Sequence, residues 1–319
     1  MATGGGYGEA MSLSEDPHWP RAGNWPDRHH HRRGTVDVAL LGLPTFRTSL
    51  STTGAHTTPA AIRAALRRYS TFHTGPGPGG GAGQGMDAGE LIWSDAGDVA
   101  EPDGAGEGAA IQAVSEHAAR ARLLIALGGD NAATVPAALG AWGEQIGSAG
   151  LVTLDAHHDL RDGISNGSPV RRLLEAGLDG RRVAQIGIAD FANSAYYRAR
   201  AAEHGITVIG RDELHHRPMA QVLTEALALA GGAGGPVHVD LDVDVCDRAV
   251  APACPASIPG GISAAELRIA ARTAGAHRQV TSIDITEVDA SADTDDQRTV
   301  RLAALCVLEA GAGLMAREV

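Results

Sequence analysis

Acidic side chains gather directly after three apolar runs of the chain. The segments are GGDNA at 128–132, DAHHD at 155–159 and DVDVCD at 242–247, and they follow LLIAL, GLVTL and VHVDL. Short apolar runs bounded by polar residues are typical of buried strands. Ligand sites of parallel sheets form at the carboxyl ends of the strands, so we expect the three segments to meet at one edge of a sheet.

The spacing within these segments favours a metal centre. Asp155, His157 and Asp159 occupy alternate positions, as do Asp242 and Asp244. Alternate residues of an extended segment point the same way, so each set should project together. Carboxylates crowded in this way repel one another unless cations neutralise them. Oxygen ligands with one imidazole suit Mn²⁺ or a similar divalent ion, and two such ions can activate a shared water as a nucleophile.

Each segment taken alone has a simpler interpretation. Asp242 and Asp244 would also suit a strand-terminal turn or a helix cap. DAHHD after an apolar strand is more specific, and its combination with GGD and DVD in this order favours the metal site.

The rest of the chain alternates apolar runs with amphipathic stretches. We expect strands at 36–43, 123–127, 151–154, 183–188, 206–209, 237–241 and 280–285. We expect helices near 107–122, 168–177, 192–204, 218–230, 263–274 and 297–315, and one opened by Pro59. This alternation predicts an α/β fold, in which helices cover both faces of an open, mostly parallel sheet.

The predicted organisation is one domain with a tail. Residues 1–34 lack apolar periodicity and are expected to be a flexible N-terminal tail, followed by a single catalytic domain at 35–319. Residues 75–86 include GPGPGGGAGQG and are expected to form a flexible loop.

Composition narrows the class of protein. The 319 residues carry a formal net charge of −12 and no lysine, which argues against nucleic acid or an anionic membrane as a partner. Only 3% of residues are aromatic, so the core must be built from Val, Leu, Ile and Ala. The three cysteines, Cys246, Cys254 and Cys306, do not suggest a disulfide framework. With neither a secretory signal nor a membrane-spanning run, the sequence predicts a soluble cytoplasmic enzyme.

On these motifs the chain resembles the ureohydrolase (arginase) superfamily over residues 36–315. GGDNA, DAHHD, DLDVDVCD and ITEVD carry the resemblance, together with Gly54-Ala55, the segment PAAIR at 59–63 and Asp98. The resemblance implies a three-layer arginase-like fold, a centre of two Mn²⁺ ions and a homo-oligomer, either a trimer or a hexamer.

The resemblance also implies a role for each ligand position. Asp155 and Asp242 would bridge the two ions. Asp159 would hold one ion, and His157 and Asp244 the other. Glu287, in SIDITEVD, would pair with the cationic amidine or guanidinium of the substrate.

Two positions depart from the usual pattern of the superfamily. Asn131 stands where a histidine usually binds the same ion as Asp159, which makes the identity of the metal uncertain and predicts a weaker first site. Asn166 stands where arginase- and agmatinase-like chains usually place a histidine for proton transfer. An amide does no acid–base work near neutral pH, but it can orient substrate through hydrogen bonds.

DAHHDLRD and NGSPVRRLLE resemble the formimidoylglutamase branch of the superfamily. That enzyme splits N-formimidoyl-L-glutamate into formamide and L-glutamate in histidine degradation. Its substrate carries two carboxylates, so Arg161, and with a weaker case Arg171, are candidates for binding them. The alternatives are a salt bridge of Arg161 to Asp162 or in the neighbourhood of Asp159, and a solvated Arg171.

The resulting hypothesis is hydrolysis of an amidine-type C–N bond. Glu287 holds the amidinium while Asp159 takes a proton from the nucleophile and passes it to the leaving amine. His158 should point away from the site because its neighbour His157 points in. Two alternatives stay open: hydrolysis of a guanidino compound such as agmatine or guanidinobutyrate with release of urea, and a non-catalytic protein of the same fold.

Overall fold

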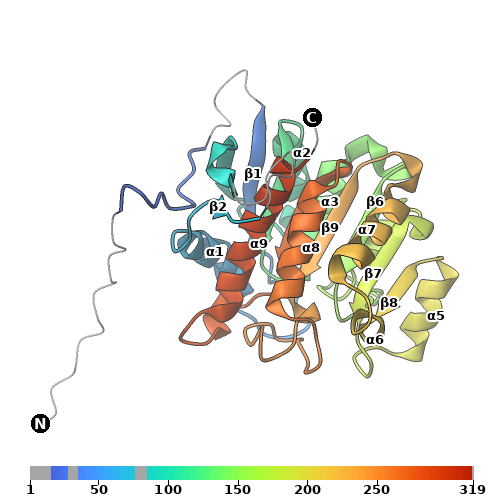
Figure 1. The fold of residues 1–319 in the computed structure, drawn as a ribbon. Coiled ribbons are helices and arrows are strands. Elements are labelled where there is room, and N and C mark those ends of the chain that lie inside the picture. The colour runs from blue at the N-terminus through green and yellow to red at the C-terminus, as the bar shows by residue number, and fades with distance from the viewer. Residues whose placement is uncertain (1–15, 28–34, 76–84, 318–319) are drawn as a thin grey trace, which may run out of the picture.

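A single parallel sheet organises the protein (Figure 1). The computed structural model describes residues 16–27, 35–75 and 85–317. Within them, eight parallel strands pair in the order β4-β1-β5-β10-β9-β6-β7-β8. In chain order they are β1 Val36–Leu43, β4 Trp93–Asp98, β5 Ala121–Gly128, β6 Gly150–Leu154, β7 Val183–Ile188, β8 Thr207–Gly210, β9 Val237–Asp242 and β10 Val280–Thr286. The predicted open parallel sheet is confirmed.

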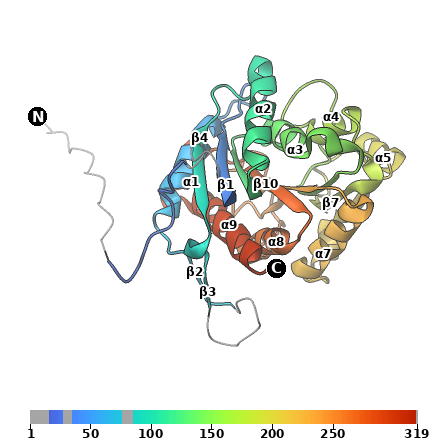
Figure 2. The ribbon, with the colours of Figure 1, turned by 90° about the horizontal axis from the view of Figure 1, so that it is seen from above.

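Helices cover both faces of this sheet, as the view in Figure 2 shows. One face carries α1 Thr58–Leu66, α7 Met219–Ala230, α8 Ala264–Ala276 and α9 Arg298–Met315. The other carries α2 Glu107–Ala118, α3 Thr134–Trp142 and α4 Pro169–Glu175. At the β8 edge lie α5 Ala195–Glu203 and α6 Arg211–Leu214. The result is the three-layer arrangement expected from the sequence.

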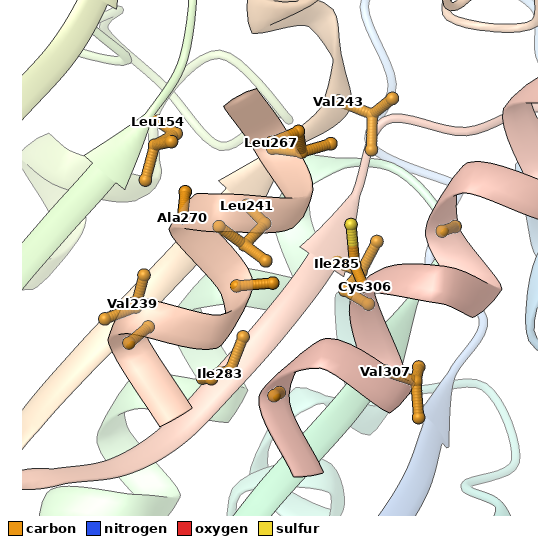
Figure 3. Close-up of a cluster of buried hydrophobic side chains, with 14 of the residues drawn as sticks. Leu154, Val239, Leu241, Val243, Leu267, Ala270, Ile283, Ile285, Cys306 and Val307 are labelled. Atoms are coloured by element: carbon orange, nitrogen blue, oxygen red, sulfur yellow. The ribbon is translucent and has the colours of Figure 1, made fainter. Parts of the chain in front are cut away.

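Alternate residues of the central strands build the core on the α8 and α9 side. Figure 3 shows strand residues such as Val239, Leu241 and Ile283 packed against Leu267 of α8 and Val307 of α9. These side chains are fully buried, and aliphatic residues dominate the core as the low aromatic content predicts. Because Val239 and Leu241 face this layer, the residues between them must face α3.

Most expected strands coincide with observed ones, but α3 and β4 were not predicted, and neither were some short elements such as α6. α3 is buried nearly all round, so it has no polar face and no amphipathic period. β4 is an edge strand whose sequence WSDAGD is polar toward its end. α3 begins shortly after Asn131, and β4 pairs with β1.

The described part of the expected flexible tail packs against the domain, which corrects that expectation for residues 22–25. Ala22 is buried and its N–H donates to the carbonyl of Tyr69 at 2.9 Å. Trp25 stacks on Trp93 with ring centroids 4.2 Å apart. Aromatic stacking and backbone pairing hold a segment whose composition suggested mobility.

Most of the expected flexible loop at 75–86 lies outside the described residues. Its last residue, Met86, is buried and belongs to β3 Met86–Asp87, which pairs with β2 Phe72–His73 in an antiparallel hairpin. The flexible assignment therefore does not apply to Met86.

Candidate metal centre and active site

Four neighbouring strands deliver the polar segments to one edge of the sheet. Asp155 follows β6, Asp242 ends β9 and Glu287 follows β10, while Asn131 lies just after β5. β5, β10, β9 and β6 are consecutive neighbours in the sheet. The expected meeting of the segments is confirmed, and a pocket of about 420 Å³ is lined by residues that follow β6, β9 and β10.

Asp155, His157 and Asp244 form a compact set of donor atoms that fits a metal ion. One donor atom from each residue lies within 4.8 Å of the others. The Nδ1 of His157 is 2.6 Å from Oδ2 of Asp244 and 3.5 Å from Oδ1 of Asp155. Oδ2 of Asp155 is buried and has no hydrogen-bond partner among the described residues. A buried carboxylate oxygen without a donor is what a cation would satisfy.

The electrostatics of this group also call for a cation. Burial, followed by the negative charge of Asp244, raises the pKa of Asp155 to about 7. Burial alone would lower the pKa of His157, but hydrogen bonds and charges from Asp155 and Asp244 raise it to about 11. The shifts show that this cluster favours a positive charge between its carboxylates, which a bound cation would supply.

Asp159 and Asp242 complete the acidic cluster. Both line the same pocket as His157 and Asp244, and burial is the main cause that raises their pKa well above the ordinary aspartate value. Asp159 has φ of +54°, so the chain is no longer extended there. The simple alternation expected for DAHHD thus fails at its last residue, although that residue still reaches the pocket.

Asn131 contacts Asp159 through its amide nitrogen rather than presenting its oxygen. Its Nδ2 donates to Oδ2 of Asp159 at 2.5 Å, while its Oδ1 accepts from the hydroxyls of Thr134 at 2.6 Å and Thr286 at 3.2 Å. The amide nitrogen can only donate, so it faces the carboxylate oxygen while the amide oxygen faces the two hydroxyls. In this orientation the amide oxygen, the atom expected to bind the metal, faces the two threonine hydroxyls, and the amide nitrogen holds Asp159.

Glu287 is held in the pocket by two asparagines. Its Oε1 accepts from the backbone N–H of Asn131 at 2.9 Å and from Nδ2 of Asn166 at 2.6 Å. Burial, followed by the charge of Asp130, raises the pKa of Glu287 to about 8. Its φ is +58°, a conformation that non-glycine residues keep only when the surroundings enforce it, often at functional sites.

Asn166 is held in place by protein contacts. Besides donating to Glu287, its Oδ1 accepts from the backbone N–H of Leu50 at 3.0 Å. Its own N–H donates to the carbonyl of Thr48 at 3.3 Å. In this arrangement Asn166 orients Glu287.

The two arginine candidates lie in different surroundings. Arg161 lines the pocket, is exposed, and has no salt bridge within the described residues. The neighbouring Asp162 pairs instead with Arg200 at 2.8 Å, so the alternative of an Arg161–Asp162 bridge is wrong. Arg171 is buried and bonds to backbone carbonyls, so it is neither solvated nor a lining residue of the pocket.

His158 is locked by Gln185. Its Nδ1 lies 2.7 Å from Oε1 of Gln185, whose Nε2 donates to the carbonyl of His158 at 2.9 Å. Burial lowers the pKa of His158, which favours the neutral ring. His158 nevertheless lines the pocket. The expectation that it points wholly away from the site is therefore not met.

A row of buried polar residues beneath the site escaped the sequence analysis. Asp240 of β9 pairs in register with Asp284 of β10, and His238 lies one step further from the site. Nε2 of His238 is 3.3 Å from Oδ1 of Asp284, and Thr286 donates to Asp240 at 3.2 Å. Parallel strands covered on both faces are usually apolar throughout, so this polar alternation was the available signal.

Comparison with known proteins places the chain in a family. A sequence model of the arginase family matches residues 36–312. Formimidoylglutamase from Halalkalibacterium halodurans is 34% identical over 307 residues, covering 88% of this chain and 92% of that protein. The chain therefore belongs to the arginase family, and it is a hydrolase of the ureohydrolase superfamily.

Solved structures agree with this placement. The crystal structure of formimidoylglutamase from Bacillus subtilis is similar with a TM-score of 0.86 and 28% identity, covering 98% of this chain and 97% of that one. Formiminoglutamase from Trypanosoma cruzi, solved with Mn²⁺, shares the fold with a TM-score of 0.76 at 24% identity, covering 89% and 95%.

Among the helices that the structure describes, none combines the length and apolar character needed to span a bilayer.

Proposed function

We propose that this protein hydrolyses N-formimidoyl-L-glutamate to L-glutamate and formamide, with two Mn²⁺ ions as cofactors. The observation that carries the proposal is one pocket in which a cation-demanding acidic cluster, a buried glutamate and an exposed arginine converge. Similarity to proteins named formimidoylglutamase over most of the chain supports the choice of substrate. The corresponding role in a cell is histidine degradation.

The metal ligands in this proposal are carboxylates and one imidazole. Asp155 and Asp242 would be shared by the two ions, His157 and Asp244 would hold one ion, and Asp159 would hold the other. When bound, such a pair lowers the pKa of a shared water and so supplies a nucleophile near neutral pH. The unpartnered Oδ2 of Asp155 and the compact donor set support this assignment. Asn131 contributes to the Asp159 half of the site through its hydrogen bond to that carboxylate.

Glu287 is the residue that we assign to the amidine. Its ionised carboxylate accepts N–H bonds from the cationic formimidoyl group and holds the electrophilic carbon over the nucleophile. Asn166 and the backbone of Asn131 already fix one of its oxygens, so the group is oriented before substrate arrives.

Two further side chains complete the catalytic scheme. Arg161 binds a carboxylate of the glutamate moiety, for which its exposed guanidinium in the pocket is suited. Asp159 accepts the proton of the nucleophile and passes it to the nitrogen of the leaving amine. The C–N bond then breaks, and the amino group of glutamate leaves as a neutral amine.

The remaining features of the proposal concern partners and place. We assign a small-molecule substrate, a cytoplasmic location and a homo-oligomeric state, either a trimer or a hexamer. The net charge of −12 supports the exclusion of nucleic acid as a partner.

Product identification tests the proposal. Protein reconstituted with Mn²⁺ is offered N-formimidoyl-L-glutamate, arginine, agmatine and guanidinobutyrate in parallel. Formamide from the first compound alone is the expected result. Urea from any of the others would move the enzyme to the guanidino-hydrolysing group, and the absence of both product and bound metal would favour a non-catalytic protein.

A further inference from the structure

A single buried arginine contacts the loop between Asp159 and Gly163 at three places. Arg171 is the third residue of α4, where a backbone N–H has no partner inside the helix. This N–H donates to the carbonyl of Asp159 at 3.2 Å. The side chain of Arg171 donates from Nε to the carbonyl of Arg161 at 2.6 Å and from Nη2 to the carbonyl of Gly163.

The remaining nitrogen of this guanidinium is also used. Nη1 of Arg171 pairs with Glu175, one turn along α4, at 2.5 Å. The side chain is buried and therefore makes its contacts away from bulk water, where hydrogen bonds from a charged donor are strong. Arg171 thus fixes alternate carbonyls at 159, 161 and 163 from the end of one helix.

The loop that Arg171 holds has an unusual backbone. Asp159 has φ of +54° and Gly163 has φ of +78°. A left-handed aspartate is retained only where surrounding contacts enforce it. Asp159 and Arg161, two of the three loop residues that line the pocket, both have their carbonyls held by Arg171.

We propose that Arg171 is a positioning residue that sets two parts of the site at once. Through the backbone it places the carboxylate of Asp159 at the metal centre and the guanidinium of Arg161 in the pocket. This inference rests on the proposed function for the substrate that Arg161 binds. The side chain holds the carbonyls of Arg161 and Gly163, and the backbone N–H holds that of Asp159, so the side chain acts on Asp159 through the path of the loop.

The chain provides a matched control in the next residue. Arg172 lies on the same helix and is also largely buried, but its guanidinium forms a two-pronged pair with Glu107 of α2 at 2.8 and 2.6 Å. Replacing Arg172 removes a charge and an ion pair from α4 without removing a contact to the 159–163 loop.

The test compares Arg171→Met with Arg172→Met on two substrates. The substrates are N-formimidoyl-L-glutamate and N-propylformamidine, which has the same reactive group but no carboxylate. For Arg171→Met we expect kcat to fall at least about tenfold on both, because losing the side-chain bonds at 161 and 163 lets the loop shift Asp159 even though the backbone N–H at 171 still donates to its carbonyl. We expect KM to rise about tenfold only for the carboxylate-bearing substrate. Arg172→Met should keep the wild-type ratio of the two KM values.

Mn²⁺ affinity, measured by calorimetry without substrate, gives a readout that does not depend on turnover. Arg171→Met should bind one of its two ions about 10–100-fold more weakly, the usual effect of losing a residue that orients a ligand. Arg171→Lys keeps the charge and one donor, should fall between wild type and Arg171→Met, and serves if the methionine variant does not fold.

Unchanged Mn²⁺ affinity and an unchanged KM ratio in the Arg171 variants would overturn the inference, as would equal effects in Arg172→Met. If wild-type protein releases no formamide, the proposed function fails, while the affinity measurement still decides whether Arg171 positions Asp159.

Discussion

At the scale of single residues, Asn131 links the metal side of the site to the amidine side. Its side chain donates to Asp159, its backbone N–H donates to Glu287, and its amide oxygen accepts from two threonine hydroxyls. The neutral amide holds the proposed metal ligand Asp159, but it does not itself supply a strong metal ligand. The proposed first metal site should therefore bind its ion less tightly than a site with an imidazole.

Asn131→His tests this account of the first site. An imidazole in place of the amide offers a nitrogen ligand beside Asp159, so we expect Mn²⁺ to bind at least about tenfold more tightly there. Isothermal calorimetry on metal-free protein measures the change. Asn131→Ala, which supplies neither a ligand nor a donor, should not tighten binding, and equal affinities in wild type and Asn131→His would remove the reason for calling the site weak.

The residue types of the candidate site were predictable, but the contacts that orient them were not. Asp155, His157, Asp242 and Asp244 follow apolar strands, so the sheet alone brings them together. The hydrogen bonds from Arg171 depend on left-handed residues in the 159–163 loop. No periodicity in the sequence predicts the backbone path of that loop.

At the scale of elements, the site depends on how closely β1 and β5 approach at their carboxyl ends. The N–H of Gly129 donates to the carbonyl of Leu43 at 3.1 Å, and that of Asp130 donates to the carbonyl of Thr45 at 3.0 Å. A Cβ on Gly129 would lie only 2.1 Å from the carbonyl oxygen of Thr45. The second glycine of GGDNA is therefore required by backbone contact.

Gly129→Ala should destabilise the protein, while Gly108→Ala should not. The first change forces two backbone segments apart, which we expect to lower the free energy of unfolding by about 1–3 kcal/mol. Gly108 is exposed in α2 with nothing within 4 Å of an added Cβ, so alanine there should raise stability by about 0.5–1 kcal/mol. Urea denaturation of both variants measures the difference; equal stabilities would contradict the close-contact account.

The predictability of the elements follows their surroundings. Strands such as β6 are buried on both faces and gave apolar runs, and most helices expose one polar face. α3 has no such face, so the signal of a 3.6-residue period is absent. The polar row of His238, Asp240 and Asp284 reverses the usual apolar composition of central strands because it lies directly beneath the acidic site.

At the scale of the whole molecule, the aliphatic core encloses all three thiols. Cys246, Cys254 and Cys306 are free and buried. Burial raises the pKa of each thiol, well above the ordinary value for Cys246 and Cys254. A thiol kept neutral and shielded from solvent is a poor nucleophile.

The folded protein should therefore resist thiol reagents. We expect no cysteine to react with a disulfide dye under native conditions and all three to react after denaturation. The absorbance of the released dye gives the number of thiols that have reacted. Rapid labelling of a thiol in the native state would show that the core opens more readily than its packing implies.

Metal dependence is the central claim for the molecule, and titration of metal-free protein with Mn²⁺ tests it most directly. Formamide and glutamate released from N-formimidoyl-L-glutamate are quantified against the metal bound per chain. The account predicts no turnover in the absence of metal and full turnover as the second ion binds. In Asp155→Asn, both the binding of the metal pair and turnover should be lost. Turnover of the metal-free protein, or undiminished turnover in Asp155→Asn, would contradict the proposed dinuclear centre.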